Sequence, residues 1–100
     1  MEMVNAFVLV NVGTKNIREI AKSLIDVSGV TEVYPVAGEY DILVVIRVTD
    51  NVTLSKIITD EIIHKEGVLH TKTLFALDAY SKVDLNSTFG VSWIFWKTYI

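Results

Sequence analysis

Hydrophobic and polar positions alternate in four segments of the chain, and two segments between them repeat at helical spacing. From Val4 to Val12 every second residue is apolar, as expected of a strand with one buried face. Residues 17–25 place apolar side chains three and four apart, the pattern of a helix lying on a core. A second helix is predicted from Asp50 to the region of Gly67, with Leu54, Ile57, Ile58 and Ile62 on its apolar face. Three further strands are predicted at residues 30–37, 42–49 and 68–77.

This order of elements predicts an α+β, ferredoxin-like βαββαβ fold with a four-stranded antiparallel sheet. Right-handed crossovers place the first and third strands at the sheet centre, and these two strands are the most apolar. Pro35 places the strand at 30–37 at an edge, because proline donates no ladder hydrogen bond. The central positions that topology gives the first and third strands therefore agree with their high content of apolar residues.

The second face of this sheet has more apolar residues than a solvent-exposed sheet face normally has. Phe7, Leu9 and one side of 42–48 lie on it, and the fourth strand adds either Leu74 and Ala76 or Phe75 and Leu77. A solvated sheet face is normally polar, and large exposed apolar patches mark interfaces. Either a second copy packed sheet to sheet or the last twenty residues folded back would cover it. We expect the dimer.

Charge and composition narrow the possible functions. The chain has 9 basic and 12 acidic residues, a net charge of −3, which disfavours nucleic-acid binding. It has no cysteine, so disulfides and thiolate metal sites are excluded. No apolar run reaches the roughly 18–20 residues of a membrane span, and the N-terminus lacks the basic segment of a secretory signal. We expect a cytoplasmic protein that does not contact a membrane.

Three motifs follow one another along the chain: GVTEVY at 29–34, VAGEYDILV at 36–44 and GVLHTKTL at 67–74. Together they resemble the effector-binding domain of the Lrp/AsnC transcription regulators (leucine-responsive and asparagine regulators), often called the RAM domain. The resemblance covers residues 4 to about 78. It implies a ferredoxin-like ligand-binding domain over 1–79 and a C-terminal extension over 80–100. It also implies a regulatory module with no enzymatic activity and no cofactor.

The resemblance implies partners as well. Full-length members carry an N-terminal helix-turn-helix that binds DNA, whereas this chain starts at the first strand. It therefore resembles the effector domain alone, with no direct nucleic-acid contact expected. The family assembles as dimers with facing sheets, a dimeric α+β barrel, and often as a tetramer of dimers. A free amino acid binds where two dimers meet, and co-assembly with full-length regulators is a further expectation.

The resemblance places the ligand-binding residues in the second and third motifs, at Gly38, Glu39, Tyr40, Asp41, Leu69, Thr71 and Thr73. Chemically, backbone N–H groups around Gly38 suit an α-carboxylate, because glycine lets the main chain approach and bend. Asp41 suits the ammonium group. The two threonines would add hydroxyls, and Leu69 would contact the ligand's side chain. The structural alternative is that Gly38 only forms a turn that Asp41 caps.

Other chemistry has weaker support in the sequence. His64 and His70 fall on different elements without the spacing of a zinc site, so no metal site is expected. The alternative function is a small enzyme or accessory subunit on a dimeric α+β barrel, similar to the cofactor-free monooxygenases. Such an enzyme needs a deep pocket inside each subunit, for which His70, Asn11 and Tyr34 are the available residues.

The extension at 80–100 departs from the family pattern. Residues 89–96 alternate like a strand and are too short to span a membrane. Three explanations are open: an added strand on the sheet edge of its own or a neighbouring subunit, a plug for an assembly cavity, or residues that are foreign to the domain. We expect an oligomer contact.

Overall fold

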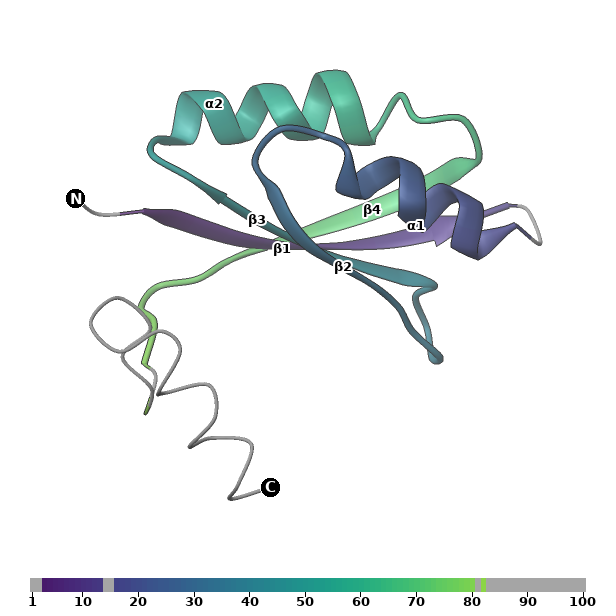
Figure 1. The fold of residues 1–100 in the computed structure, drawn as a ribbon, viewed down its shortest axis with the longest axis horizontal. Coiled ribbons are helices and arrows are strands. Elements are labelled where there is room, and N and C mark those ends of the chain that lie inside the picture. The colour runs from purple at the N-terminus through teal and green to yellow at the C-terminus, as the bar shows by residue number, and fades with distance from the viewer. Residues whose placement is uncertain (1–2, 14–15, 81, 83–100) are drawn as a thin grey trace.

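The structure, a computed structural model, describes residues 3–13, 16–80 and 82. Both helices lie on the same side of one antiparallel sheet, in the strand order β2-β3-β1-β4 (Figure 1). This confirms the predicted ferredoxin-like βαββαβ fold. The elements are β1 (Val4–Val12), α1 (Ile17–Ile25), β2 (Val30–Pro35), β3 (Ile42–Val48), α2 (Asn51–Lys56), the π-helical segment η1 (Ile57–Ile62) and β4 (Val68–Phe75).

The predicted strand positions are confirmed, with β2 and β4 each two residues shorter than expected and β3 one residue shorter. β1 and β3 are central, and β2, which contains Pro35, is an edge strand. β2 ends at Pro35 because Val36 N–H donates to the carbonyl of Asp41 and closes the hairpin loop. β4 ends at Phe75, after which Ala76 N–H makes one more bond to the carbonyl of Asn5. Leu77, beyond that bond, is 96% exposed.

The core lies between the sheet and the helices. Alternating residues of β1 and β3 face it, because successive side chains of a strand point to opposite faces. No polar or charged side chain is buried among the described residues, so the interior is held by apolar packing. The fully or nearly fully buried residues include Ala6, Val8 and Val10 of β1, Ile42, Val44 and Ile46 of β3, Leu24 of α1, Leu54 of α2 and Ile62 of η1.

The second helix changes its winding halfway along. In η1 the N–H of Ile63 donates to the carbonyl of Ile58, a five-residue interval that defines a π-helical turn. This wider turn brings Ile57 and Ile62, five residues apart, onto the core together. The sequence predicted a single helix here with Ile57 and Ile62 on its buried face. The burial is confirmed, and the change of winding is new.

The face of the sheet away from the helices has an apolar centre. Phe7 lies between Val45 and Leu74, and the cross-strand partners Leu9 and Leu43 lie beside them. These five residues are called the open-face cluster below. Val45 is only 6% exposed because its neighbours surround it. Of the two alternatives for β4, the structure selects Leu74 and Ala76, since Phe75 pairs with Ala6 on the helix side.

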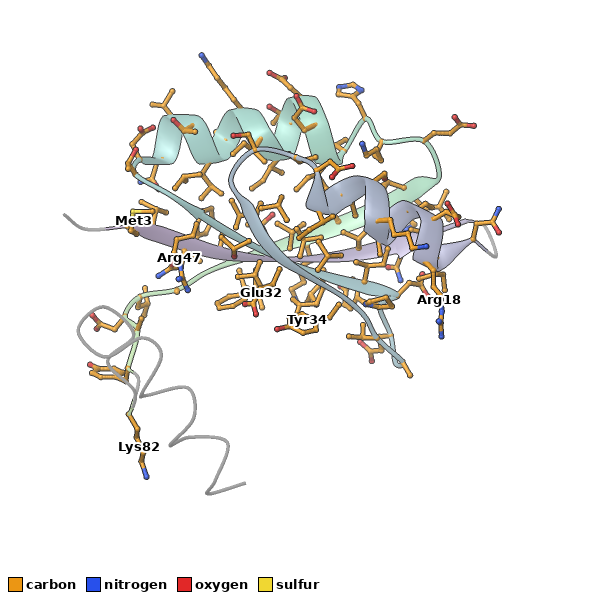
Figure 2. All side chains as sticks on the ribbon, in the orientation of Figure 1. Met3, Arg18, Glu32, Tyr34, Arg47 and Lys82 are labelled. Carbon is orange, nitrogen blue, oxygen red and sulfur yellow. The ribbon has the colours of Figure 1, made fainter. Side chains whose placement is uncertain are left out.

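Polar groups surround the open-face cluster. At one end Arg47 Nε donates to Asn5 Oδ1 at 2.8 Å. On β2 the Tyr34 hydroxyl donates to Glu32 Oε2 at 2.6 Å, and this bond raises the pKa of Tyr34. Figure 2 shows Glu32, Tyr34 and Arg47 extending from the sheet on the side away from the helices. An apolar centre within a polar rim is the usual anatomy of a protein interface.

The start of α2 provides a test of the fold's pH dependence. Asp50 accepts hydrogen bonds from the N–H and hydroxyl of Thr53, and these bonds lower its pKa. The cap is therefore fully stabilising above about pH 4, the range in which an unfolded-state Asp is ionised, and weakens as pH falls through the folded-state pKa. We predict that Asp50→Asn, which keeps an acceptor oxygen, flattens the loss of stability between neutral and acidic pH. Urea unfolding across that range measures it, and an unchanged pH profile contradicts it.

Candidate functional site

The loop between β2 and β3 is bent by a glycine. Gly38 has φ +146°, a backbone conformation that side chains with a Cβ rarely adopt. A Cβ placed there would meet nothing within 4 Å, so crowding does not require the glycine. The conformation requires it, and the space beside the loop is open. The turn that the sequence predicted at Gly38 is therefore present.

Asp41 fastens this loop to the end of β1. β3 begins at Ile42, which pairs with Val10, so no β3 residue is opposite Val12. The Asp41 carboxylate takes that place, with Oδ2 accepting from Val12 N–H at 2.9 Å, while Asp41 N–H donates to the Val10 carbonyl. Asp41 therefore has a structural role, in which its carboxylate bonds to β1 instead of capping the Gly38 turn as the sequence alternative proposed. Its second oxygen, Oδ1, accepts no hydrogen bond from the described residues.

Asn11 holds the same loop from the neighbouring position. Its amide Nδ2 donates to the backbone carbonyl of Glu39 at 2.8 Å. This role of Asn11 in the loop was not predicted from the sequence. A polar residue near the end of an apolar strand, with a glycine loop predicted to reach that end, is the signal that could have found it. Together Asn11 and Asp41 position the backbone from Glu39 to Asp41, including half-buried Tyr40.

The three expected residues of β4 lie elsewhere. Thr71 pairs with Val10 and Thr73 with Val8, so both half-buried threonines lie on the helix side of the sheet. Leu69 is 61% exposed and lies against Gly13, where a Cβ atom would come within 3.0 Å of Leu69 Cδ1. His70, on the open face, pairs with Asn11.

One chain does not bring all these groups to one small ligand. Asp41 precedes β3 and the threonines lie on β4, with β1 between them. Two strand spacings amount to about 10 Å, whereas the ammonium and carboxylate of an amino acid are next to each other on one carbon. Within a single chain, the loop residues Gly38 to Asp41 form one group and Leu69, Thr71 and Thr73 form a second.

The residues required by the alternative enzymatic function are also apart. Asn11 and His70 are cross-strand partners, but Tyr34 lies on β2, at the opposite edge, and its hydroxyl is bonded to Glu32. No group of three or more metal-ligating side chains occurs in residues 3–13, 16–80 and 82. No helix in those same stretches is long and apolar enough to cross a bilayer. Residues 80–100 were expected to make an oligomer contact. Apart from Tyr80 and Lys82, which are exposed, they lie outside the described residues.

The described chain is thus a ferredoxin-like sheet with one open apolar face and a glycine loop fastened to β1. The sequence profile of the "Lrp/AsnC ligand binding domain" matches residues 5–84, and the chain belongs to this family. Residues 29–44 and 67–74, which carried the resemblance, lie within the match.

Individual relatives agree with this membership. The chain is 42% identical over 59 residues to the HTH-type transcriptional regulator LysM of Sulfurisphaera tokodaii, a match that covers 59% of this chain and 41% of LysM. The chain thus spans about two fifths of the length of the curated relatives it matches.

Solved structures of several proteins are similar to this chain, and two of them illustrate the range. The Thermus thermophilus protein TTHA0845 has a TM-score of 0.73 and 33% identity, over 79% of this chain and 99% of that one. The transcriptional regulator NMB0573 of Neisseria meningitidis, solved as a complex with L-Met, has a TM-score of 0.67 and 25% identity, over 83% of this chain and 57% of that one.

The Asp41 fastening predicts a stability change. Asp41→Ala leaves Val12 N–H without its acceptor, and we expect it to lower the free energy of unfolding by about 1–2 kcal/mol. Asp41→Asn, which keeps an acceptor oxygen, should cost clearly less. Glu39→Ala is the matched control, because Asn11 bonds to the backbone of Glu39, and it should leave stability unchanged. Urea unfolding of the three variants tests this; equal stabilities for Asp41→Ala and the native chain contradict it.

Proposed function

We propose that this domain is an amino-acid sensor that binds a free amino acid at the Gly38–Asp41 loop and alters the assembly of transcription regulators. The observation that carries the proposal is the state of Asp41: one carboxylate oxygen is fixed by Val12 N–H and the other meets no donor among the described residues. A carboxylate fixed in this way accepts a charge-assisted hydrogen bond from an ammonium group without first losing side-chain freedom.

The loop supplies the other half of zwitterion recognition. Open space lies beside Gly38, and the backbone there is held in place by the bonds to Val10, Val12 and Asn11. Backbone N–H groups at such a bend suit an anionic oxygen. In this proposal the loop backbone receives the α-carboxylate and Asp41 receives the ammonium, while Tyr40 and Glu39 border the ligand.

We propose further that the complete cleft is shared between chains. Leu69, Thr71 and Thr73 lie on β4, which β1 separates from Asp41, so they form a group apart from the loop within one chain. They would contact a ligand held by the Gly38–Asp41 loop of a neighbouring chain. Leu69, 61% exposed, is the one of the three that most readily meets such a ligand. Binding would then strengthen the contact between chains and so change the assembly.

A dimer formed through the open-face cluster is the first stage of the proposed assembly. The five apolar side chains of this cluster are contiguous across β3, β1 and β4. Apolar patches of several hundred Å² usually belong to interfaces. Association of two dimers or more, and co-assembly with full-length regulators, would bring the loops and β4 strands of different dimers together.

The relatives support the same class of function. The LysM relative is named an HTH-type transcriptional regulator, and the Neisseria meningitidis regulator was solved with L-Met. These descriptions belong to those proteins, and they make L-methionine a reasonable first ligand to test here. The enzymatic alternative has no comparable support, because no polar side chain is buried in the described part of the chain.

The ligand prediction is that at least one of the twenty amino acids raises the melting temperature and changes the mass of the assembly. Asp41→Asn should weaken binding of that amino acid by about ten-fold or more, because a neutral amide replaces the carboxylate that meets the ammonium. Glu61→Gln, the loss of an exposed acid on the helical side, is the control for charge and should bind normally. If no amino acid binds, or if Asp41→Asn binds as tightly as the native chain, the proposal fails.

The assembly prediction concerns Phe7, which lies at the centre of the open-face cluster. Phe7→Asp would bury a charge in the proposed interface, so we expect it to dissociate the dimer into monomers in sedimentation equilibrium. Val52→Asp makes a similar apolar-to-acidic change on α2, where Val52 is 67% exposed, and should leave the mass unchanged. A native mass for Phe7→Asp, with circular dichroism showing it folded, contradicts the proposed interface.

A further inference from the structure

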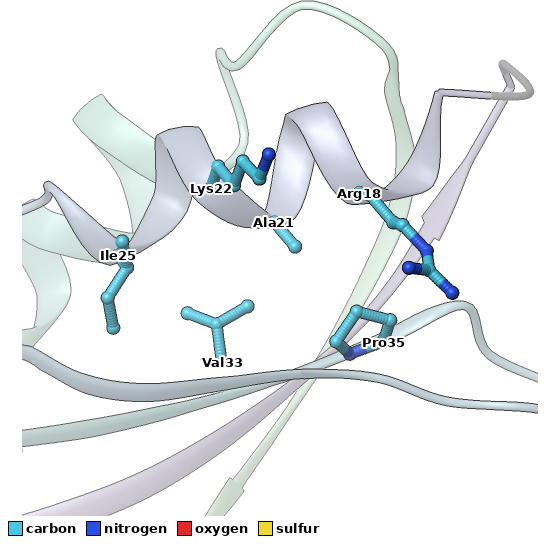
Figure 3. A pocket seen from close by; sticks show the side chains of 6 residues that line it. All are labelled: Arg18, Ala21, Lys22, Ile25, Val33 and Pro35. Atoms are coloured by element: carbon cyan, nitrogen blue, oxygen red, sulfur yellow. The ribbon is translucent and has the colours of Figure 1, made fainter.

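A second concave surface lies between α1 and the edge strand β2, on the helix side of the sheet. It has a volume of about 550 Å³, within the usual size range of small-molecule sites. Figure 3 shows α1 passing above β2 with this space between them. The groove is lined by Arg18, Ala21, Lys22, Ile25, Val33 and Pro35.

The groove exists because of one small side chain. Ala21 is the only residue of α1 in the lining with no side-chain atoms beyond Cβ, and it is positioned between Arg18 and Ile25 on the same helix. The space between α1 and β2 therefore stays open at this point. Ile25 is 44% exposed there, and Val33 points from β2 toward α1 (Figure 3). Apolar surface thus forms the wall and floor.

The charge of the groove has a single sign. Its two ionisable lining residues are Arg18 and Lys22, one helical turn apart, in a protein whose net charge is −3. Figure 3 shows the Arg18 guanidinium reaching from α1 to the side of Pro35, at one end of the groove. A guanidinium in this position binds a carboxylate with two parallel hydrogen bonds.

We propose that this groove binds a small carboxylic acid that has an apolar chain and no amino group. The carboxylate would pair with Arg18, with Lys22 adding charge, and the apolar chain would lie on Ala21, Val33 and Ile25. An α-ammonium group would be placed beside two cations with no acidic side chain in the lining, so the groove disfavours amino acids. This separates it from the Gly38–Asp41 loop, and it does not depend on the function proposed for that loop.

Two other occupants fit less well. A peptide adding as a strand to β2 would meet Pro35, which has no N–H, and the irregular register between Val30 and Glu32. A second copy packed here about a two-fold axis would bring its own Arg18 and Lys22 against this pair, which is electrostatically unfavourable. The small acid meets neither obstacle.

The test uses amide chemical shifts of the native chain during titration with 4-methylpentanoate. Two matched probes accompany it: L-leucine, which is the same acid with an amino group, and 4-methyl-1-pentanol, which lacks the carboxylate. We expect saturable shifts for residues 18–25 and 33–35 with the acid, and much weaker ones there with either matched probe. Shifts confined to residues 38–41 with an amino acid would report on the other site, so the two proposals fail or succeed separately.

Arg18→Gln removes the guanidinium from an exposed position and should raise the dissociation constant for 4-methylpentanoate by about ten-fold. Lys56→Gln, with the same change of charge on the exposed side of α2, should bind normally. Equal shifts with the acid and the alcohol, or unchanged affinity in Arg18→Gln, would overturn the proposal as adventitious hydrophobic binding. Groove shifts that follow protein dilution without any ligand would overturn it in favour of a second copy.

Discussion

Two short helices cover one side of a four-stranded sheet, and the hydrophobic effect decides what happens on the other side. The helix side buries the centre of the sheet: Val8, Val44 and Leu24 have no exposed surface. The other side has Phe7, Leu9 and Leu74 at its centre, which remain partly exposed in the single chain. Apolar surface left in water costs roughly 25 cal/mol per Å², so a partner that removes it from water is favoured.

The site proposed for ligand binding depends on the same sheet. Asp41 and Asn11 act as extensions of the hydrogen-bond ladder, one replacing a missing β3 residue and the other holding the loop carbonyl of Glu39. The loop is therefore as well placed as the central strands to which it is bonded. A ligand that bridges this loop and β4 of a neighbouring dimer would strengthen the contacts between dimers. Ligand binding and assembly are linked in this proposal because both would use the Gly38–Asp41 loop.

The sequence predicted the fold well because period-two and helical patterns report burial directly. The central positions of β1 and β3 and the edge position of Pro35 followed from topology and from the chemistry of proline. The π-helical turn at Ile57–Ile62 did not, since its apolar spacing also fits an ordinary helix. The early end of β4 depends on where its partner β1 starts, which a single segment does not reveal.

Less of the candidate site could be predicted. Gly38 and Asp41 were placed by the resemblance to the Lrp/AsnC effector-binding domain, whereas the bend at Gly38 and the bond of Asp41 to Val12 came from the structure. The hydrogen bond from Asn11 to the Glu39 carbonyl was not predicted, because it joins residues 28 positions apart. The helix-side location of Thr71 and Thr73 depends on the β1–β4 register, which no local pattern specifies. The groove between α1 and β2 likewise arises only from tertiary packing.

We propose that a second copy covers the open-face cluster, and contacts between protomers measure this directly. A sample that mixes isotope-labelled and unlabelled chains gives nuclear Overhauser effects between protomers only where two copies touch. The account predicts such effects from the methyl groups of Leu9, Val45 and Leu74 to the aromatic ring of Phe7 or its neighbours in the other copy. Their absence, in a sample whose mass is that of a single 11.2 kDa chain, would contradict it.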